Sequence, residues 1–182
     1  VEEGNPFLKP FKAMGFDATA EYYSNSGGLV SAGVFHKEID DPIYRWEITQ
    51  DNLTFEGLQF SELSFEQDRN ADSGSITGVE FAFDQLFVFL PSPFNGFGLS
   101  SNVALIRSEA KVPGRENEDL PFFGQSDLVY NVTPYFQRAG FEMRLAMSYQ
   151  SEYLDEVGEE AYLDRYGDER FTMDLTASYA FL

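Results

Sequence analysis

The chain of 182 residues contains no cysteine, a single histidine, and 12 Lys and Arg against 31 Asp and Glu, for a net charge of -19. The absence of cysteine excludes a disulfide framework, a thiolate metal site and a cysteine nucleophile. One histidine, His36, leaves no pair for a zinc site. The shortage of cations argues against nucleic acid as a partner, because phosphate binding needs Lys and Arg to displace counterions.

Long apolar runs are missing too. No segment approaches the roughly 18 consecutive apolar residues of a transmembrane helix. Aromatic residues, in contrast, make up 16% of the chain, with 19 Phe, 10 Tyr and one Trp. Acidic disordered chains are poor in aromatic residues, so we expect a folded chain. Its length suits one domain with a real core.

Apolar and polar residues alternate with a period of two, which is typical of β-strands, whereas helical spacing is nearly absent. The odd-numbered positions from Phe141 to Tyr149 are apolar and most of their neighbours are polar, and residues 171–181 repeat this pattern. Pro134 falls inside one such segment and predicts a missing ladder hydrogen bond or a bulge. We predict seven long antiparallel strands, each paired with the next, at 13–23, 28–39, 75–90, 98–109, 128–138, 140–153 and 170–181.

The connections between these strands alternate in length. Short ones fall at 24–28, 91–97 and 138–140. Long, acidic ones fall at 40–74, 110–127 and 154–169. This rhythm predicts an up-and-down meander with tight turns at one end of the sheet and long loops at the other.

A two-faced strand fits either a soluble β-sandwich or the wall of a transmembrane β-barrel. Predicted strand lengths of more than 10 residues exceed the ~5–6 that is usual in soluble sheets. Aromatic residues cluster at strand ends, as in the girdles of membrane barrels. Polar residues lie opposite the apolar row, where a water-filled lumen would solvate them. The residues that we predict to face a lumen are Glu80, Asp84, Asn102, Asn131, Glu142, Arg144 and Asp174.

Several stretches resemble one family in colinear order. Residues 5–10 (NPFLKP) resemble a signature that opens a late barrel strand of TonB-dependent outer-membrane receptors, and residues 28–40 resemble the strand that follows. Segments within 73–102 are similar to a subgroup common in Caulobacter and Xanthomonas relatives, and segments within 120–154 continue the likeness.

The resemblance implies that residues 1–182 are part of a barrel of about 22 strands, with the plug domain and the final strands outside this chain. It implies a place in the outer membrane of a Gram-negative bacterium. The implied partners are outer-membrane lipid, the receptor's own plug domain and, through it, TonB, and a small-molecule ligand. The function implied is active uptake of a carbohydrate or an iron–siderophore complex, without a cofactor.

The long connection 40–74 is the segment that we select for ligand binding. Flat aromatic rings beside carboxylates suit sugars, and Tyr44, Trp46, Asp41 and Glu47 provide both. The competing interpretation is that these aromatic residues pack the loop against its neighbours. Short alternations within the segment indicate that strands continue here.

We predict no catalytic residues and no metal site. Paired carboxylates are abundant, but 31 acidic residues produce such pairs by chance, and no calcium-loop spacing occurs. Two alternatives stay open at this point: a soluble β-sandwich that binds carbohydrate, and a passive porin-like barrel that needs no plug.

Overall fold

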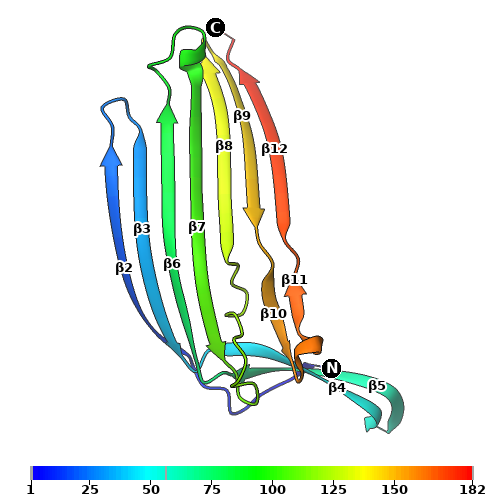
Figure 1. Cartoon of the computed structure of the whole chain (residues 1–182). Helices are drawn as coiled ribbons and strands as arrows, with labels where there is room; N and C mark the ends of the chain where they lie inside the picture. Colours follow the sequence, from blue (N-terminus) through cyan, green and yellow to red (C-terminus); the bar gives the residue numbers. More distant parts are fainter. Residues whose placement is uncertain (1, 56, 182) are drawn as a thin grey trace.

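The computed structural model describes residues 2–55 and 57–181, which are largely β-strand (Figure 1). The elements in chain order are β1 (Glu2–Glu3), β2 (Lys12–Tyr23), β3 (Leu29–Asp40), β4 (Ile43–Phe55), β5 (Leu58–Asn70), β6 (Ser73–Leu86), η1 (Phe94–Gly96), β7 (Phe97–Lys111), β8 (Leu128–Arg138), β9 (Phe141–Gln150), β10 (Tyr153–Gly158), η2 (Ala161–Leu163), β11 (Arg165–Gly167) and β12 (Arg170–Tyr179).

The main sheet has seven strands in the order β12-β9-β8-β7-β6-β3-β2, and every pair in it is antiparallel. These are the seven strands that the alternation predicts, and the predicted meander of neighbours is confirmed. The sheet is curved and open (Figure 1). Its strands have 10 to 15 residues. The largest boundary difference is in β6, which ends at Leu86 and not at residue 90.

The predicted separation of the two faces is confirmed where β9 pairs with β12. Leu145 lies opposite Leu175, and Met147 opposite Met173. Because directly paired residues share a face and sequence neighbours do not, Arg144 and its partner Thr176 lie on the other side. A shift of the pairing by one residue would move every side chain to the opposite face. The β9–β12 ladder keeps one register over ten pairs.

Pro134 has the effect that its missing N–H predicts. The β8–β9 ladder runs to Val132 and Met147, skips two positions, and resumes in the same register at Tyr135 and Arg144. The outcome is a gap in the ladder without a bulge. On the other side of β8, Pro134 still lies opposite Leu99.

The connection 40–74, expected to be a long loop, is a β-hairpin of two 13-residue strands, β4 and β5. It belongs to a second sheet with the order β1-β5-β4-β10-β11. Two pairings in this sheet are parallel, β1 with β5 and β10 with β4. The indication that strands continue here is therefore correct, and the expectation of a loop is wrong for most of the segment.

The far half of this hairpin bends. Asn52 has a φ of 53°, and the ladder skips from Asp51–Glu62 to Leu53–Phe60. The ring of Phe55 consequently lies 5.8 Å from that of Phe65, although Phe55 is paired with Leu58 at the tip.

All long connections meet at one end of the main sheet and all tight turns at the other (Figure 1). We call the structure at the first end, formed by β1, β4, β5, β10, β11, η2 and residues 112–127, the loop body. Its buried core draws on three separate connections of the main sheet and consists of Tyr44, Trp46, Ala71, Val112, Leu120, Leu154 and Val157.

Two glycines of the main sheet lie directly under aromatic rings. A Cβ at Gly98 would come within 2.2 Å of the Tyr135 ring, and one at Gly78 within 2.5 Å of the Phe35 ring. Each glycine is the ladder partner of the ring that covers it. The rings lie flat against the sheet because these positions carry no side chain, as in the aromatic rescue of strand glycines.

Candidate functional site

One face of the main sheet is apolar and uncovered. Phe16, Val34, Phe81, Met173 and Leu175 belong to it and are 50 to 68% exposed. Soluble monomers rarely expose a continuous apolar surface of this extent. The face therefore needs an apolar environment that this chain does not provide.

The aromatic residues at the turn end of the sheet are not ladder partners of one another; from β2 to β12 their positions shift progressively along the strands. Ladder partners connect Tyr22 in β2, across six strand-to-strand steps, to Met173 in β12. The aromatic residue at that end of β12 is Tyr179, six residues further along. With a rise of about 3.3 Å per residue and a strand spacing of about 4.8 Å, this drift corresponds to a tilt of about 35°. Transmembrane barrel strands are tilted by about that angle.

The opposite face carries the polar residues selected from the sequence. The register places all seven on this one face: Glu80, Asp84, Asn102, Asn131, Glu142, Arg144 and Asp174. Asn102 and Asn131 are direct partners, and Ser148 Oγ lies 2.6 Å from Asn131 Oδ1, to which it donates a hydrogen bond. The sequence pattern thus assembles one polar surface across five strands, β6, β7, β8, β9 and β12.

Towards the turn end of this surface, Arg144 lies over the ring of Tyr135, with Cζ 5.0 Å from the ring centroid. Its Nε also forms an ion pair with Glu142. Tyr135 is buried against Gly98 and Arg144 although it lies on the polar face. Arg144 is therefore held in place by a ring on one side and a carboxylate on the other.

The structure brings the aromatic residues of 40–74 into the loop-body core. Tyr44 is 3% exposed and Trp46 is 8% exposed. The rings of Tyr44 and Phe123 stack with centroids 5.1 Å apart, and Arg69 lies over the Trp46 ring at 4.9 Å. The indole N–H of Trp46 is buried and has no hydrogen-bond partner among the described residues.

The two carboxylates selected with them differ in exposure: the Asp41 side chain is 37% exposed and the Glu47 side chain only 13%. Asp41 forms an ion pair of 3.3 Å with Lys9, within the NPFLKP stretch. Lys9 N donates to Asn70 Oδ1, and Asn70 Nδ2 donates to Lys9 O, so this stretch is fastened to the base of the hairpin. Glu47 Oε1 accepts a hydrogen bond from Arg165 Nη2 at 3.2 Å, and Glu47 Oε2 forms an ion pair with Arg165 Nε at 3.1 Å.

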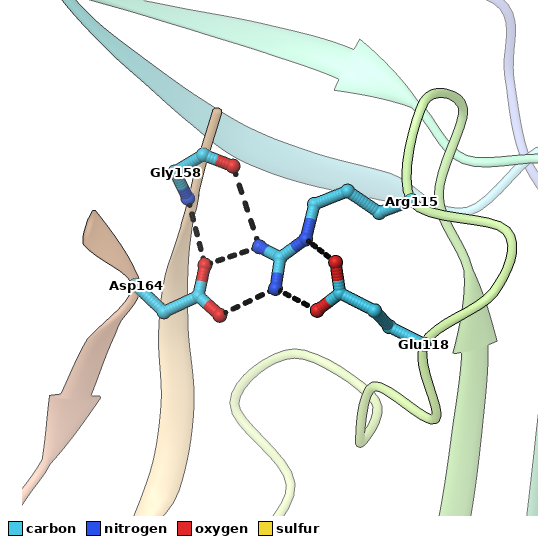
Figure 2. Close-up of polar contacts among 4 residues, drawn as sticks. All are labelled: Arg115, Glu118, Gly158 and Asp164. Atoms are coloured by element: carbon cyan, nitrogen blue, oxygen red, sulfur yellow. Dashed lines mark hydrogen bonds and ion pairs between the residues drawn. The ribbon is translucent and has the colours of Figure 1, made fainter. Parts of the chain in front are cut away.

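A buried arginine joins two of the connections (Figure 2). Arg115 Nη1 and Nη2 donate to the two carboxylate oxygens of Asp164 at 2.5 and 2.9 Å. Nε and Nη2 donate to Glu118 at 3.0 and 2.5 Å, and Nη1 donates to Gly158 O at 3.3 Å. A guanidinium has five N–H donors, so every donor of Arg115 has an acceptor. We call this group the Arg115 clamp.

The electrostatics of the clamp favour its charged form. Hydrogen bonds to Glu118 and then Asp164 raise the pKa of the Arg115 guanidinium above its usual value. The hydrogen bond from Arg115 lowers the pKa of the Glu118 carboxyl below its usual range. Burial raises the pKa of the Tyr44 phenol in the adjoining core.

Sequence patterns did not single out the aromatic rings that the loop body leaves exposed. Tyr162 is 83% exposed and Tyr166 is 50% exposed. Tyr162 lies in η2, whose C-cap is the clamped residue Asp164. The clamp therefore holds in place a turn that displays an aromatic ring. The acidic sequence around Tyr162 shows no alternation or motif that would predict its exposure on this turn.

No helix in the described part of the chain is long and apolar enough to cross a membrane. Within residues 2–55 and 57–181, no three His, Asp or Glu side chains lie close enough together to hold a metal ion.

An uncovered apolar face, a polar opposite face and tilted antiparallel strands of 10 to 15 residues define the wall of a membrane-spanning β-barrel. The model of the TonB-dependent receptor-like β-barrel family matches residues 1–181, and the chain belongs to this family. This family is one of transporters and receptors, and it implies the outer membrane of a Gram-negative bacterium.

Among solved structures, the chain is similar to the siderophore receptor PirA from Acinetobacter baumannii. The TM-score is 0.59 at 12% identity, and the match covers 100% of this chain and 27% of that chain. At this identity the likeness shows the fold, and the chain spans about a quarter of the length of that receptor. A comparison with curated proteins finds no match.

Proposed function

We propose that this chain forms part of the wall and external surface of an active transporter for a small uncharged carbohydrate. The observation that carries the ligand class is the charge of the loop end. The segments 40–74, 110–127 and 154–169 contain 20 acidic and five basic residues, so they hold -15 of the chain's net charge of -19. A mouth of this charge repels anionic ligands and leaves uncharged ones unaffected.

An iron–siderophore complex is the second candidate, favoured by the fold of PirA. Many ferric chelates are anionic, and the acidic loop end opposes their approach. We propose that the plug domain and TonB act on this wall from outside the chain, as in the family. The uncovered apolar face argues against the soluble sandwich, because water would have to cover it.

Ligand contact is assigned to side chains of the loop body that are at least partly exposed, of which Glu47 is the most covered and is held by Arg165. We propose contact through the Asp41 and Glu47 carboxylates and the rings of Tyr162 and Tyr166, with Tyr44 and Trp46 as the packed support beneath them. A rigid aromatic ring gives a ligand a large contact area at low entropic cost. The lumen-facing row around Asn102, Asn131 and Ser148 offers amide and hydroxyl groups further along the path.

Uptake by cells that produce the intact receptor tests this function. We expect uptake of labelled neutral oligosaccharides, stopped by an uncoupler, and no receptor-dependent uptake of ferric catecholate. Uptake that survives the uncoupler would support a passive porin. Receptor-dependent uptake of ferric catecholate without oligosaccharide uptake would replace the proposed ligand class.

A further inference from the structure

A hollow lies on the lumen side of the main sheet, where small residues of β3, β6 and β7 adjoin one another. It has a volume of about 190 Å³, and the side chains around it include Thr19, Ser31, Glu80 and Asn102. Gly33 keeps it open, because a Cβ there would lie 3.3 Å from Thr19 Oγ1 and 4.0 Å from Glu80 Cβ. Sites that enclose drug-sized ligands have about 300–1,000 Å³. The hollow therefore suits a single ring of a ligand.

A flat aromatic ring lies beside the hollow. Phe35 is the next residue after Gly33 on this side of β3, and its ring lies against Gly78, where a Cβ would come within 2.5 Å of it. Because the ring lies flat on the sheet, one of its faces is turned to the lumen. The exposed Lys37 lies over this ring, with Nζ 5.9 Å from the centroid. Since a lysine side chain is flexible, a ligand on the ring can displace it or accept a hydrogen bond from it.

The polar groups of the hollow are free to bind a ligand. In the part of the chain that the structure describes, no side-chain hydrogen bond or ion pair involves Ser31, Glu80 or Asn102. Elsewhere on this face polar groups pair with one another, as Ser148 does with Asn131. A carboxylate accepts hydrogen bonds, whereas amide and hydroxyl groups both donate and accept them. This combination matches the hydroxyl groups of a sugar, each of which is both a donor and an acceptor.

The hollow is separate from the loop body. Glu80 lies seven residues from Ser73, the residue at which β6 leaves the loop body. Seven residues correspond to about 23 Å along a strand. A ligand that is captured by the loop body therefore meets the hollow only after it has entered the barrel.

We infer that the hollow is a second sugar site inside the barrel, which holds one ring of a neutral oligosaccharide during transport. The apolar C–H face of the sugar packs on Phe35, and its hydroxyl groups bond to Ser31, Glu80 and Asn102. Gly33 allows the sugar to approach the wall closely. The inference rests on the proposed function and adds to it a defined position on the transport path.

The test uses cells that produce the intact receptor and take up cellotriose or maltotriose carrying a photoreactive diazirine. Illumination during uptake links the sugar to the residues that it touches, and mass spectrometry of the purified receptor locates the links. In energised cells we expect links in the loop body and also in β3, β6 and β7 around Gly33, Glu80 and Asn102. With an uncoupler the links should be confined to the loop body.

Two variants alter the hollow in different ways, and a third is the matched control. Gly33→Val fills the hollow, and Glu80→Gln removes its carboxylate. Each should lower the wall links and the maximal uptake rate roughly tenfold, the effect of losing a hydrogen bond to a charged group, with unchanged links in the loop body. Asp174→Asn makes the same acid-to-amide change on the lumen face of β12, four strands from β6, and should change none of these quantities. Gel mobility with and without heating confirms that each variant is a folded barrel.

Three results would contradict the inference in distinguishable ways. Links confined to the loop body in energised cells, or undiminished wall links in Gly33→Val, would overturn it and leave the proposed function standing. A leak of sugar through Glu80→Gln in uncoupled cells would also overturn it, because the hollow would then hold a side chain of the plug domain. No uptake and no link anywhere in the receptor would overturn the proposed function and the inference with it.

Discussion

Arg115 and Asp164 lie 49 residues apart and share two parallel hydrogen bonds of 2.5 and 2.9 Å inside the loop body. The Arg115 and Asp164 side chains are only 3 and 4% exposed, so the Asp164 carboxylate depends on Arg115 for compensation, whereas Arg115 also pairs with Glu118. The pair connects segment 112–127 to the turn that carries Tyr162. We therefore expect the two connections to move as one body.

Removing one partner of this clamp should loosen both connections. We expect Asp164→Asn to open them with a loss of roughly 2 kcal/mol, because it removes the buried carboxylate that accepts two charge-assisted hydrogen bonds and leaves Arg115 only Glu118 as a counter-charge. Hydrogen exchange of the intact receptor should show faster exchange in residues 112–127 and 159–164. Arg165→Lys is the matched control, since its ion pairs to Glu47 and Glu156 involve an exposed arginine and should contribute under about 1 kcal/mol. Equal effects of the two variants would contradict the clamp.

The clamp also predicts a pH dependence. The pKa of the Glu118 carboxyl is lowered by its hydrogen bond from Arg115, from a usual value of 4.5. A carboxyl with a lowered folded-state pKa contributes stability that is present above its usual pKa and is lost as the pH falls through the folded value. Protection of residues 112–127 from exchange, corrected for intrinsic rates, should be constant from pH 7 to 5 and should fall below 4.5. Glu118→Gln should remove this loss of protection at low pH. If the loss is unchanged in the variant, other titratable groups cause it.

Arginine substitutions on the two faces of β9 test which face of the sheet contacts lipid. Leu145 lies on the apolar face and Ser148 on the polar face of the same strand. Leu145→Arg should cost about 2–4 kcal/mol, as an arginine does near the bilayer midplane. Ser148→Arg should cost much less, because its side chain reaches water in the lumen. Folding titrations in lipid vesicles measure both, and similar losses would contradict the division into lipid and lumen faces.

Period-two alternation was sufficient to predict the main sheet and the face to which Leu145 and Leu175 belong. The missing N–H of Pro134 predicted a missing ladder hydrogen bond or a bulge, and the structure has a gap in the ladder without a bulge. These features depend on local chemistry: side-chain alternation and a missing N–H. Local sequence patterns could not predict the second sheet, because its β10–β4 pairing joins residues more than a hundred positions apart. The burial of Tyr44 and Trp46 depends on the same long-range packing. Arg115 has no sequence signature, since its acceptors come from two separate segments.

Gly98 should be intolerant of any side chain. A Cβ there would lie 2.2 Å from the Tyr135 ring, whereas one at Gly33, on the same face, would meet nothing closer than 3.3 Å. Gly98→Ala should displace Tyr135 and with it Arg144, and should lower the temperature at which the barrel unfolds on gels. Gly33→Ala should leave that temperature nearly unchanged. Adding Tyr135→Ala to Gly98→Ala should remove the clash, so a double variant no more stable than Gly98→Ala would contradict this explanation.

Trp46 and Tyr162 separate packing from ligand contact. Trp46→Ala should cost roughly 3–5 kcal/mol of loop-body stability, the usual loss for a large aromatic residue in a core. Tyr162→Ala removes a ring that is 83% exposed and should leave stability unchanged. Uptake by the intact receptor should fall about thirtyfold in affinity for Tyr162→Ala, if this ring is the ligand anchor that we propose. Surface amounts of each variant are measured in parallel. Normal uptake with Tyr162→Ala would show that other groups contact the ligand. Loss of uptake in Trp46→Ala with an intact loop body would show that the indole N–H of Trp46 contacts the ligand.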